Sequence, residues 1–270
     1  MNLILSQAPV FLLVFVRCAA MIFTLPLLSM RGVPRVAKIA FAGYLAYFIM
    51  GSVDFRVYAT YIAGDGTMSL VFLLIAVGEA LIGIIIGFFV TIIFSAFSAS
   101  GQFIAFQMGL SAASSYDSLS QVENPLMGQF FNLVAMLVFM QTKWFQALFL
   151  KGLTESFGSL NAVSLAASGN QIVRFMMGSL TDLFADALVI ALPIMGTLSL
   201  ITITTGLLSK AAPQMNLLSE GFPVMILVAF TVIAFLIPGI IDFFVRSFNK
   251  GFSDLQIFFR SVSQTAAGGV

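Results

Sequence analysis

The chain has 270 residues, of which 60% are hydrophobic and only 9% charged, and its formal net charge is +1. Soluble domains contain about 45–50% apolar and about 25% charged residues, so a soluble fold could not cover this much apolar surface. A net charge this small gives no field that would attract nucleic acid. Composition therefore predicts a polytopic membrane protein and excludes nucleic acid as a partner.

The chain lacks the residues on which most metal and acid–base chemistry depends. It has no histidine, which is the commonest metal ligand and general base. Its single cysteine, Cys18, excludes an internal disulfide and any multi-cysteine zinc or iron–sulfur site. We therefore expect no cofactor, no metal and no enzymatic activity.

Apolar segments that reach or approach the length of a spanning helix, about 17–25 residues, divide the chain. They cover Ala8–Ser29, Val36–Val53, Ser69–Ser98, Pro125–Met140, Leu183–Leu208 and Phe222–Val245. Because the N-terminus lacks a positive region and a cleavage site, we expect it to enter the first membrane segment rather than form a signal peptide. These six segments predict an all-α fold of membrane-associated helical hairpins.

Arg17 lies in the middle of the first segment, where an unpaired charge is costly. The candidate partners are acidic residues of the other segments: Glu79, Asp182, Asp186 and Asp242. A structural ion pair and a functional charge both remain open interpretations of Arg17.

The third segment is too long for one simple span and carries small residues at intervals of four. Gly101, Ala105, Gly109 and Ala113 would share one face of a helix and allow close approach of another helix. For the upstream pair, Gly83 and Gly87, ordinary helix packing is the favoured interpretation. The serine-rich stretch Gly101–Tyr116 instead favours a flexible element inside a bundle or along a water-filled path.

Two longer connections and a proline-bounded turn complete the pattern. Gly101–Asn124 is small, polar and flexible, whereas Thr142–Asp182 begins with two lysines and has a centre of Ser, Ala, Gly and Asn residues. The end of the chain, Ser261–Val270, is expected to be a disordered tail. Pro193 is expected to interrupt the fifth segment. The run Lys210–Pro223 predicts a hairpin tip between two apolar helices. Its characteristic residues are Pro213, Gln214, Asn216, Gly221 and Pro223.

The positions of the Lys and Arg residues do not show which segments end on the cytoplasmic side of the membrane. If successive segments cross in alternating directions, more Lys and Arg residues lie on the side of the C-terminus, which favours a cytoplasmic C-terminus. The densest short cluster of positive charges, Arg31, Arg35 and Lys38, nevertheless lies on the opposite side. Either one segment is not a true span, or partner subunits override the usual rule.

The run from Lys210 through Asn216 to Gly221, Phe222 and Pro223 resembles the FliR family, a component of the flagellar type III export gate. The injectisome counterpart of that family is less similar. Supporting matches extend over most of the chain: Phe15–Arg17, Pro26, Pro34, Gly101–Gln102, Gln107–Gly109, Asp117 and Pro125. The chain departs from the family pattern at Ser118 and at Thr142–Trp144.

The resemblance implies an architecture and a set of partners. A FliP-like part would occupy residues 1–181, a FliQ-like helical hairpin 182–246, and a C-terminal extension 247–270. Expected partners are FliP- and FliQ-like subunits, an FlhB-like export component, membrane lipid and the exported unfolded proteins. The expected location is the bacterial inner membrane, at the flagellar basal body. Such gates stand largely out of the bilayer plane, which would explain the divided charge count.

The family's plug-like loop would fall on about residues 106–124. The gate candidates that follow are Gln107, Met108, Gly109, Ala113, Ser114, Tyr116 and Asp117.

The residues give weaker support to two other classes of function. A secondary transporter would use Arg17, Glu79 and Asp182 as charges at the middle of the membrane, but the sequence has no two matching halves. An intramembrane enzyme could use Asp182 and Asp186, one helical turn apart, but no nucleophile–base pair supports it. A non-enzymatic channel subunit is the favoured hypothesis.

Overall fold

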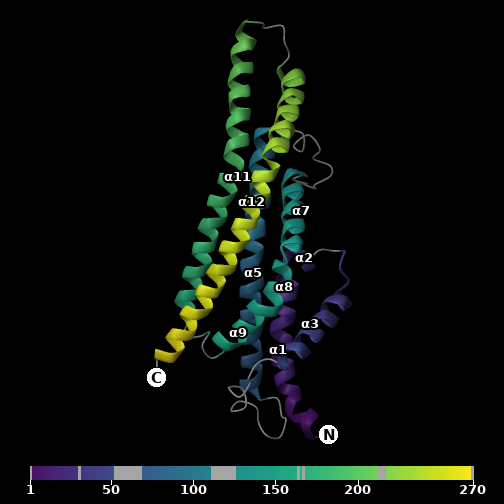
Figure 1. The fold of residues 1–270 in the computed structure, drawn as a ribbon, viewed down its shortest axis with the longest axis vertical. Helices are drawn as coiled ribbons and strands as arrows, with labels where there is room; N and C mark the ends of the chain where they lie inside the picture. Colours follow the sequence, from purple (N-terminus) through teal and green to yellow (C-terminus); the bar gives the residue numbers. More distant parts are fainter. Residues whose placement is uncertain are drawn as a thin grey trace. The chain divides into compact units, whose positions relative to one another are not determined.

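The structure is a computed structural model, and it describes residues 2–29, 32–51, 69–110, 126–162, 165, 168–211 and 217–268. Every regular element in these ranges is a helix (Figure 1). The elements are α1 (Asn2–Thr24), α2 (Pro26–Ser29), α3 (Arg35–Met50), α5 (Leu70–Gln107), α7 (Leu126–Gln141), α8 (Trp144–Ala147), a π-helical turn (Leu148–Gly152), α9 (Leu153–Ser159), α11 (Gly169–Ala211) and α12 (Leu217–Gly268). The expected all-α class is confirmed for this part of the chain.

The chain forms two compact units, which are described separately. Unit 1 comprises Met1–Ile92, Lys143–Ser179 and Asn249–Val270, and unit 2 comprises Ile93–Thr142 and Leu180–Phe248. Helices α5, α11 and α12 each supply residues to both units.

In unit 1, α1 packs against α3 and against the first half of α5. Leu13, Phe72 and Ile75 form a buried cluster that Ala162 helps to cover. Aromatic rings join more distant parts of the unit, since Phe175 stacks on Phe258 with ring centroids 4.4 Å apart.

Two expectations for this unit are wrong. The segment Thr142–Asp182 is not mainly a polar connection, because α8, the π-helical turn and α9 occupy residues 144–159. Phe149, Leu153 and Phe157 recur there at intervals of four and are buried. The residues from Ser261 onward are not a disordered tail as far as the structure describes them, since α12 continues to Gly268 and Val262 is buried.

Phenylalanine rings form the core of unit 2. Phe97 lies 4.0 Å from Phe244 and 5.5 Å from Phe248, while Phe94 and Phe139 lie 5.2 Å and 5.1 Å from Phe248 (centroid distances). These contacts join α5, α7 and α12 through large apolar surfaces.

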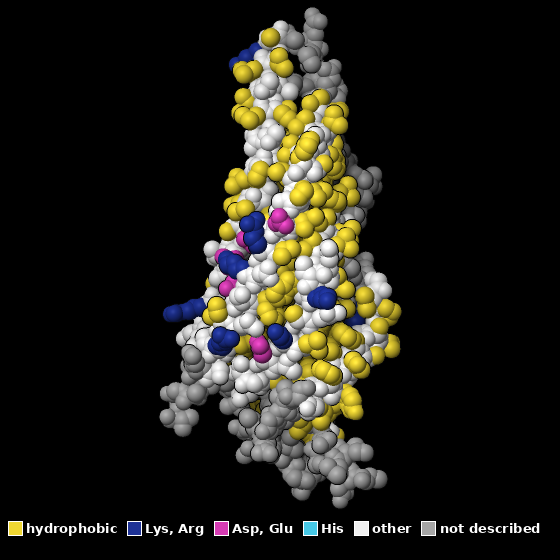
Figure 2. Space-filling model, viewed as in Figure 1, with side chains coloured by type: hydrophobic (Ala, Val, Ile, Leu, Met, Phe, Trp, Pro, Cys, Tyr) yellow, Lys and Arg dark blue, Asp and Glu magenta, His cyan; other side chains and the backbone are white. Residues whose placement is uncertain are grey.

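Much of the apolar surface of unit 2 is not covered by the chain itself. Figure 2 shows hydrophobic side chains over much of the visible face of α11 and α12. Within unit 2, the most exposed large hydrophobic residues of α11 and α12 are Leu200, Ile203, Leu207, Leu227 and Phe235. Such contiguous apolar surface needs lipid or an apolar partner.

Among the residues that the structure describes, three helical stretches could cross a membrane by length and composition: Leu70–Gln107, Gly169–Ala211 and Gly221–Ser263. Leu126–Gln141 and Trp144–Ser159 make a fourth candidate if this bent pair is one span. The 38 residues of α5 are about 57 Å long at 1.5 Å per residue, well beyond a hydrocarbon core of about 30 Å.

The described residues do not supply all six expected spans, because the first two apolar segments give only the shorter apolar helices Ala8–Thr24 and Arg35–Met50. The first is divided at Leu25, between α1 and α2. Pro26 lacks a backbone N–H and disfavours helical geometry in the residue before it. The second is α3, whose 16 residues fall short of the roughly 20 that span a bilayer.

The prolines of the C-terminal half do not end their helices. Helix α11 runs through Pro193, so the expected interruption is wrong, and α12 contains Pro223 and Pro238. Loss of one backbone hydrogen bond is tolerated where the turns on either side remain bonded. Residues 182 and 246 lie inside α11 and α12, and the division into a FliP-like part, a FliQ-like hairpin and an extension stays a prediction.

The hairpin tip is shorter than expected. Helix α11 ends at Ala211 and α12 begins at Leu217, so Gly221 and Pro223 belong to a helix and not to the turn. Pro213, Gln214 and Asn216 lie outside the described residues.

Candidate functional site

A buried ion pair in unit 1 joins α1 to α5. Nη2 of Arg17 lies 2.6 Å from Oε2 of Glu79, and both side chains are completely buried. Nε of Arg17 donates to the same oxygen at 2.6 Å. Two guanidinium nitrogens on one carboxylate oxygen make a strong charge-assisted contact. Among the four acidic candidates, the structure pairs Arg17 with Glu79.

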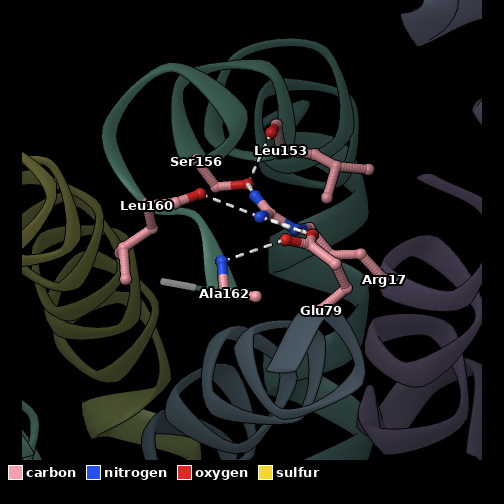
Figure 3. A network of polar contacts seen from close by, with 6 residues as sticks. All are labelled: Arg17, Glu79, Leu153, Ser156, Leu160 and Ala162. Carbon is pink, nitrogen blue, oxygen red and sulfur yellow. Dashed lines mark hydrogen bonds and ion pairs between the residues drawn. The ribbon is translucent and has the colours of Figure 1, made fainter. Parts of the chain in front are cut away.

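Helix α9 and the residues after it complete the surroundings of Arg17 (Figure 3). Nη1 donates to Ser156 Oγ at 3.1 Å, and Nη2 donates to the carbonyl of Leu160 at 2.8 Å. Ser156 Oγ in turn donates to the carbonyl of Leu153 at 2.6 Å. Carbon Cζ of Arg17 lies 3.8 Å from the centre of the Phe157 ring, a cation–π contact.

The carboxylate of Glu79 has a second partner, because the backbone N–H of Ala162 donates to Oε1 at 3.2 Å. Burying an ion pair is tolerated only where further hydrogen bonds satisfy both groups. This network meets that condition and ties α1, α5 and α9 together. We refer to Arg17, Glu79, Ser156, Leu160 and Ala162 as the arginine network.

Sequence reasoning identified Arg17 and Glu79 but missed the other three members. Leu160 and Ala162 contribute backbone atoms, which leave no signature in a side-chain pattern. Ser156 lies between Glu155 and Phe157 in a segment expected to be a connection, where nothing in the pattern sets it apart from the other serines. In unit 2, Asp186 accepts a hydrogen bond from Ser247 at 2.6 Å.

Gly83 and Gly87 lie where α5 crosses α1. A Cβ added at Gly83 would overlap the carbonyl oxygen of Arg17, and one at Gly87 would overlap the Thr24 side chain. Thr91 Oγ1 also donates to the Thr24 carbonyl at 2.9 Å. These glycines therefore permit the close approach that places Arg17 beside Glu79.

A second close crossing, in unit 2, joins α5 to α7. A Cβ at Gly101 would lie 2.7 Å from Cα of Gly128, and one at Gly128 would lie 2.9 Å from the carbonyl oxygen of Ser98. Ala105, one turn after Gly101, is buried. Gly128 is absent from the residues singled out in the sequence, because a lone glycine has no partner at a spacing of four.

The small-residue ladder does not continue along one helix, and this corrects the expectation. Helix α5 ends at Gln107, and Gly109 has a φ of +77°. That left-handed conformation is accessible to glycine and strained for other residues. Ala113, Ser114, Tyr116 and Asp117 lie outside the described residues.

The end of α5 is held by contacts with α11 and α12 within unit 2. Nε2 of Gln107 donates to Ser199 Oγ at 3.2 Å. Met108 is completely buried. The Phe222 ring lies directly against Gly109, where a Cβ would overlap Cδ1 and Cε1 of the ring. Three gate candidates, Gln107, Met108 and Gly109, therefore lie together at a defined turn.

No group of three or more potential metal ligands was found among the described residues. The arginine network also places no free nucleophile beside a base, since the Ser156 hydroxyl donates to a carbonyl. The arginine network and the contacts at the end of α5 both hold helices in fixed positions.

Comparison with known proteins gives a consistent result over most of the chain. The family described as bacterial export proteins, family 1, matches residues 8–251. The flagellar biosynthetic protein FliR of Bacillus subtilis (strain 168) is 31% identical over 235 residues, covering 86% of this chain and 88% of the relative. FliR of Escherichia coli (strain K12) is 31% identical over 242 residues, covering 88% of this chain and 87% of the relative.

A relative with a different name is also similar to this chain. The surface presentation of antigens protein SpaR of Shigella sonnei is 29% identical over 180 residues, covering 67% of this chain and 65% of that protein. With a family match over residues 8–251 and FliR relatives covered along most of their length, the chain belongs to bacterial export proteins, family 1, in the FliR family.

Proposed function

We propose that this chain is a core, non-enzymatic subunit of the flagellar type III protein export gate. Together with FliP- and FliQ-like subunits it forms the channel through which unfolded flagellar proteins are exported. The observation that carries the proposal is the family match over residues 8–251, on a helical chain whose long helices expose wide apolar faces. The place of action is the bacterial inner membrane, at the flagellar basal body.

The exposed apolar faces support an assembled state. Leu200, Ile203 and Leu207 on α11 and Leu227 and Phe235 on α12 are well exposed in the isolated chain. In the complex, FliP-like and FliQ-like neighbours and lipid cover these side chains. The FliP-like part is residues 1–181, the FliQ-like hairpin is 182–246 and the extension is 247–270. An FlhB-like component is a further neighbour.

The gate candidates retain their proposed role within this function. Gln107, Met108 and Gly109 form the beginning of a stretch, about residues 106–124, that closes the path at rest and moves when substrate enters. The left-handed turn at Gly109 supports this role, because it changes the direction of the chain at the point where α5 ends.

The alternative of a small-solute transporter loses its main support. It required Arg17 and Glu79 as charges accessible from a substrate path. In the structure they neutralise each other and are completely buried.

The proposal is tested by deleting the gene in its own bacterium and restoring it on a plasmid. We expect deletion to abolish motility and the secretion of flagellar proteins into the medium, and the plasmid copy to restore both. Normal secretion in the deletion strain would overturn the proposal.

A further inference from the structure

The beginning of α3, in unit 1, gathers positive charge. The first Asp or Glu in the sequence is Asp54, which follows this helix. Helix α3 opens with Arg35, Lys38 comes one turn later, and the first turn holds no acidic residue. The N-terminus of a helix carries partial positive charge of its own, which acidic side chains offset. Arg35 and Lys38 instead add to that charge.

The Lys38 side chain is buried without an anionic partner among the described residues. Only 8% of the residue is exposed, and its Nζ lies 5.8 Å from the centre of the Phe23 ring. A cation–π contact at this distance offsets only part of the cost of removing an ammonium group from water. Arg17, the other buried cation of unit 1, has the Glu79 carboxylate. Lys38 therefore calls for an anion that the described residues do not provide.

The charge of Lys38 is directed toward the start of α3. Lys38 lies beside Phe23 near the end of α1, whereas Gly43 lies beside Phe15, so the two helices run antiparallel. Side chains of a helix also lean toward its N-terminus. The backbone N–H groups at that end have no helical acceptor, and the N-cap residue, Pro34, provides no side-chain cap. Free N–H groups and two cations thus meet at one place, which is the arrangement that binds a phosphate group.

An exposed apolar face of α3 begins at the same end. Val36, Ala40, Tyr44 and Tyr47 follow one another at intervals of four and three, so they share one side of the helix. Val36 is 77% exposed, Tyr44 67% and Tyr47 76%. Tyrosine is enriched where a membrane meets water, because its ring is apolar and its hydroxyl is polar. This face is therefore suited to lipid.

We propose that the start of α3 binds the phosphate group of an anionic membrane lipid, whose acyl chains lie along the exposed apolar face. The phosphate accepts hydrogen bonds from Arg35 and from the free N–H groups of the first turn, and it neutralises Lys38. A free phosphate ion or an acidic segment of a partner protein would match the charges but would leave Val36, Tyr44 and Tyr47 uncovered. The apolar face therefore favours lipid.

The test uses the full chain, purified in mild detergent together with any subunits that accompany it. Native mass spectrometry counts the bound lipids as dioleoyl phosphatidylglycerol, or separately dioleoyl phosphatidylcholine, is added. We expect the first phosphatidylglycerol to bind about tenfold more tightly than phosphatidylcholine, because only the anionic lipid neutralises the site. Equal affinities for the two lipids would overturn the proposal, and they would leave the export function untouched.

Two variants connect the preference to this helix. Arg35→Gln and Lys38→Met should each remove most of the preference for phosphatidylglycerol. Without lipid, Lys38→Met should be at least as stable as the parent in thermal unfolding, since it removes a buried charge that lacks an anion. Arg260→Gln is the matched control, because it removes an exposed charge far from the N-terminus of α12. A preference that survives in both Arg35→Gln and Lys38→Met would overturn the proposal.

Two further measurements distinguish lipid from the other anions. Inorganic phosphate should not displace phosphatidylglycerol at equal concentration, and displacement would assign the site to the free ion and overturn the proposal. A photo-crosslinking amino acid in place of Tyr47, activated in living cells, should give an adduct with the mass of a lipid. An adduct with another protein would show that a partner covers the face, and it would also overturn the proposal.

Discussion

Arg17 and Glu79 lie 2.6 Å apart, and neither side chain is exposed to solvent. They are separated by 62 positions in the sequence and belong to different helices, α1 and α5. Because each charge also has hydrogen-bond partners in or after α9, the pair acts as part of a network. Removing one member leaves another buried charge without compensation.

The first prediction concerns the buried charge that remains when its partner is removed. Arg17→Leu should destabilise the chain by about 3–5 kcal/mol, because the Glu79 carboxylate stays buried and loses its cation. The double variant Arg17→Leu/Glu79→Leu should recover much of the loss, since both charges are then gone. Abundance in the membrane and thermal unfolding in detergent measure both effects. A single variant as stable as the parent would show that the pair does not hold the fold.

The second prediction tests whether the network depends on more than opposite charges. The reversed pair Arg17→Glu/Glu79→Arg keeps the attraction but should remain unstable. A carboxylate at 17 cannot donate to the Leu160 carbonyl, and an arginine at 79 would face the N–H of Ala162. The measurement is the melting temperature of the reversed pair compared with that of the parent protein. A reversed pair as stable as the parent would show that the backbone partners do not contribute to stability.

The third prediction concerns the crossing of α1 and α5. Gly83→Ala should lower stability by about 1–3 kcal/mol, because the new Cβ would overlap the carbonyl oxygen of Arg17. Gly178→Ala in α11 is the matched control, because an added methyl meets no atom within 4 Å. There the greater helix propensity of alanine should leave stability equal or raise it by up to about 1 kcal/mol. Equal melting temperatures for the two variants would contradict the close crossing.

The fourth prediction concerns the crossing of α5 and α7. Gly101→Ala and Gly128→Ala should each lower the abundance of the chain in the membrane. The added Cβ atoms would overlap backbone atoms of the facing helix, which cannot rotate away as a side chain can. Since both glycines lie at one crossing, the double variant should be less harmful than the sum of the two. Gly196→Ala, with nothing within 4 Å of an added Cβ, serves as the control. Strictly additive losses would argue against a shared crossing.

The elements that could be predicted from the sequence are those whose apolar character is local. The long third segment became α5, whereas the break of the first segment before Pro26 was not expected. Thr142–Asp182 was mistaken for a connection because its Ser, Gly and Asn residues obscured the buried positions Phe149, Leu153 and Phe157, which are four residues apart. Their spacing was a helical signal that composition concealed.

The site was less accessible to sequence reasoning. Glu79 could be named as one of four acidic candidates for Arg17, but only the fold chooses among residues so far apart along the chain. Gly109 follows Ala105 by four positions and so seemed to extend a helical ladder. Its left-handed turn beside Phe222 depends on a contact between distant segments, which spacing along one segment cannot reveal.

The central claim is that this chain is a subunit of an export gate whose exposed apolar faces are covered by partner subunits. Co-expression of the tagged chain with the FliP- and FliQ-like proteins of the same bacterium, followed by purification in mild detergent, tests it most directly. We predict one stable complex that contains all three proteins. Recovery of the chain without either partner, although both are abundant in the same membranes, would contradict the claim.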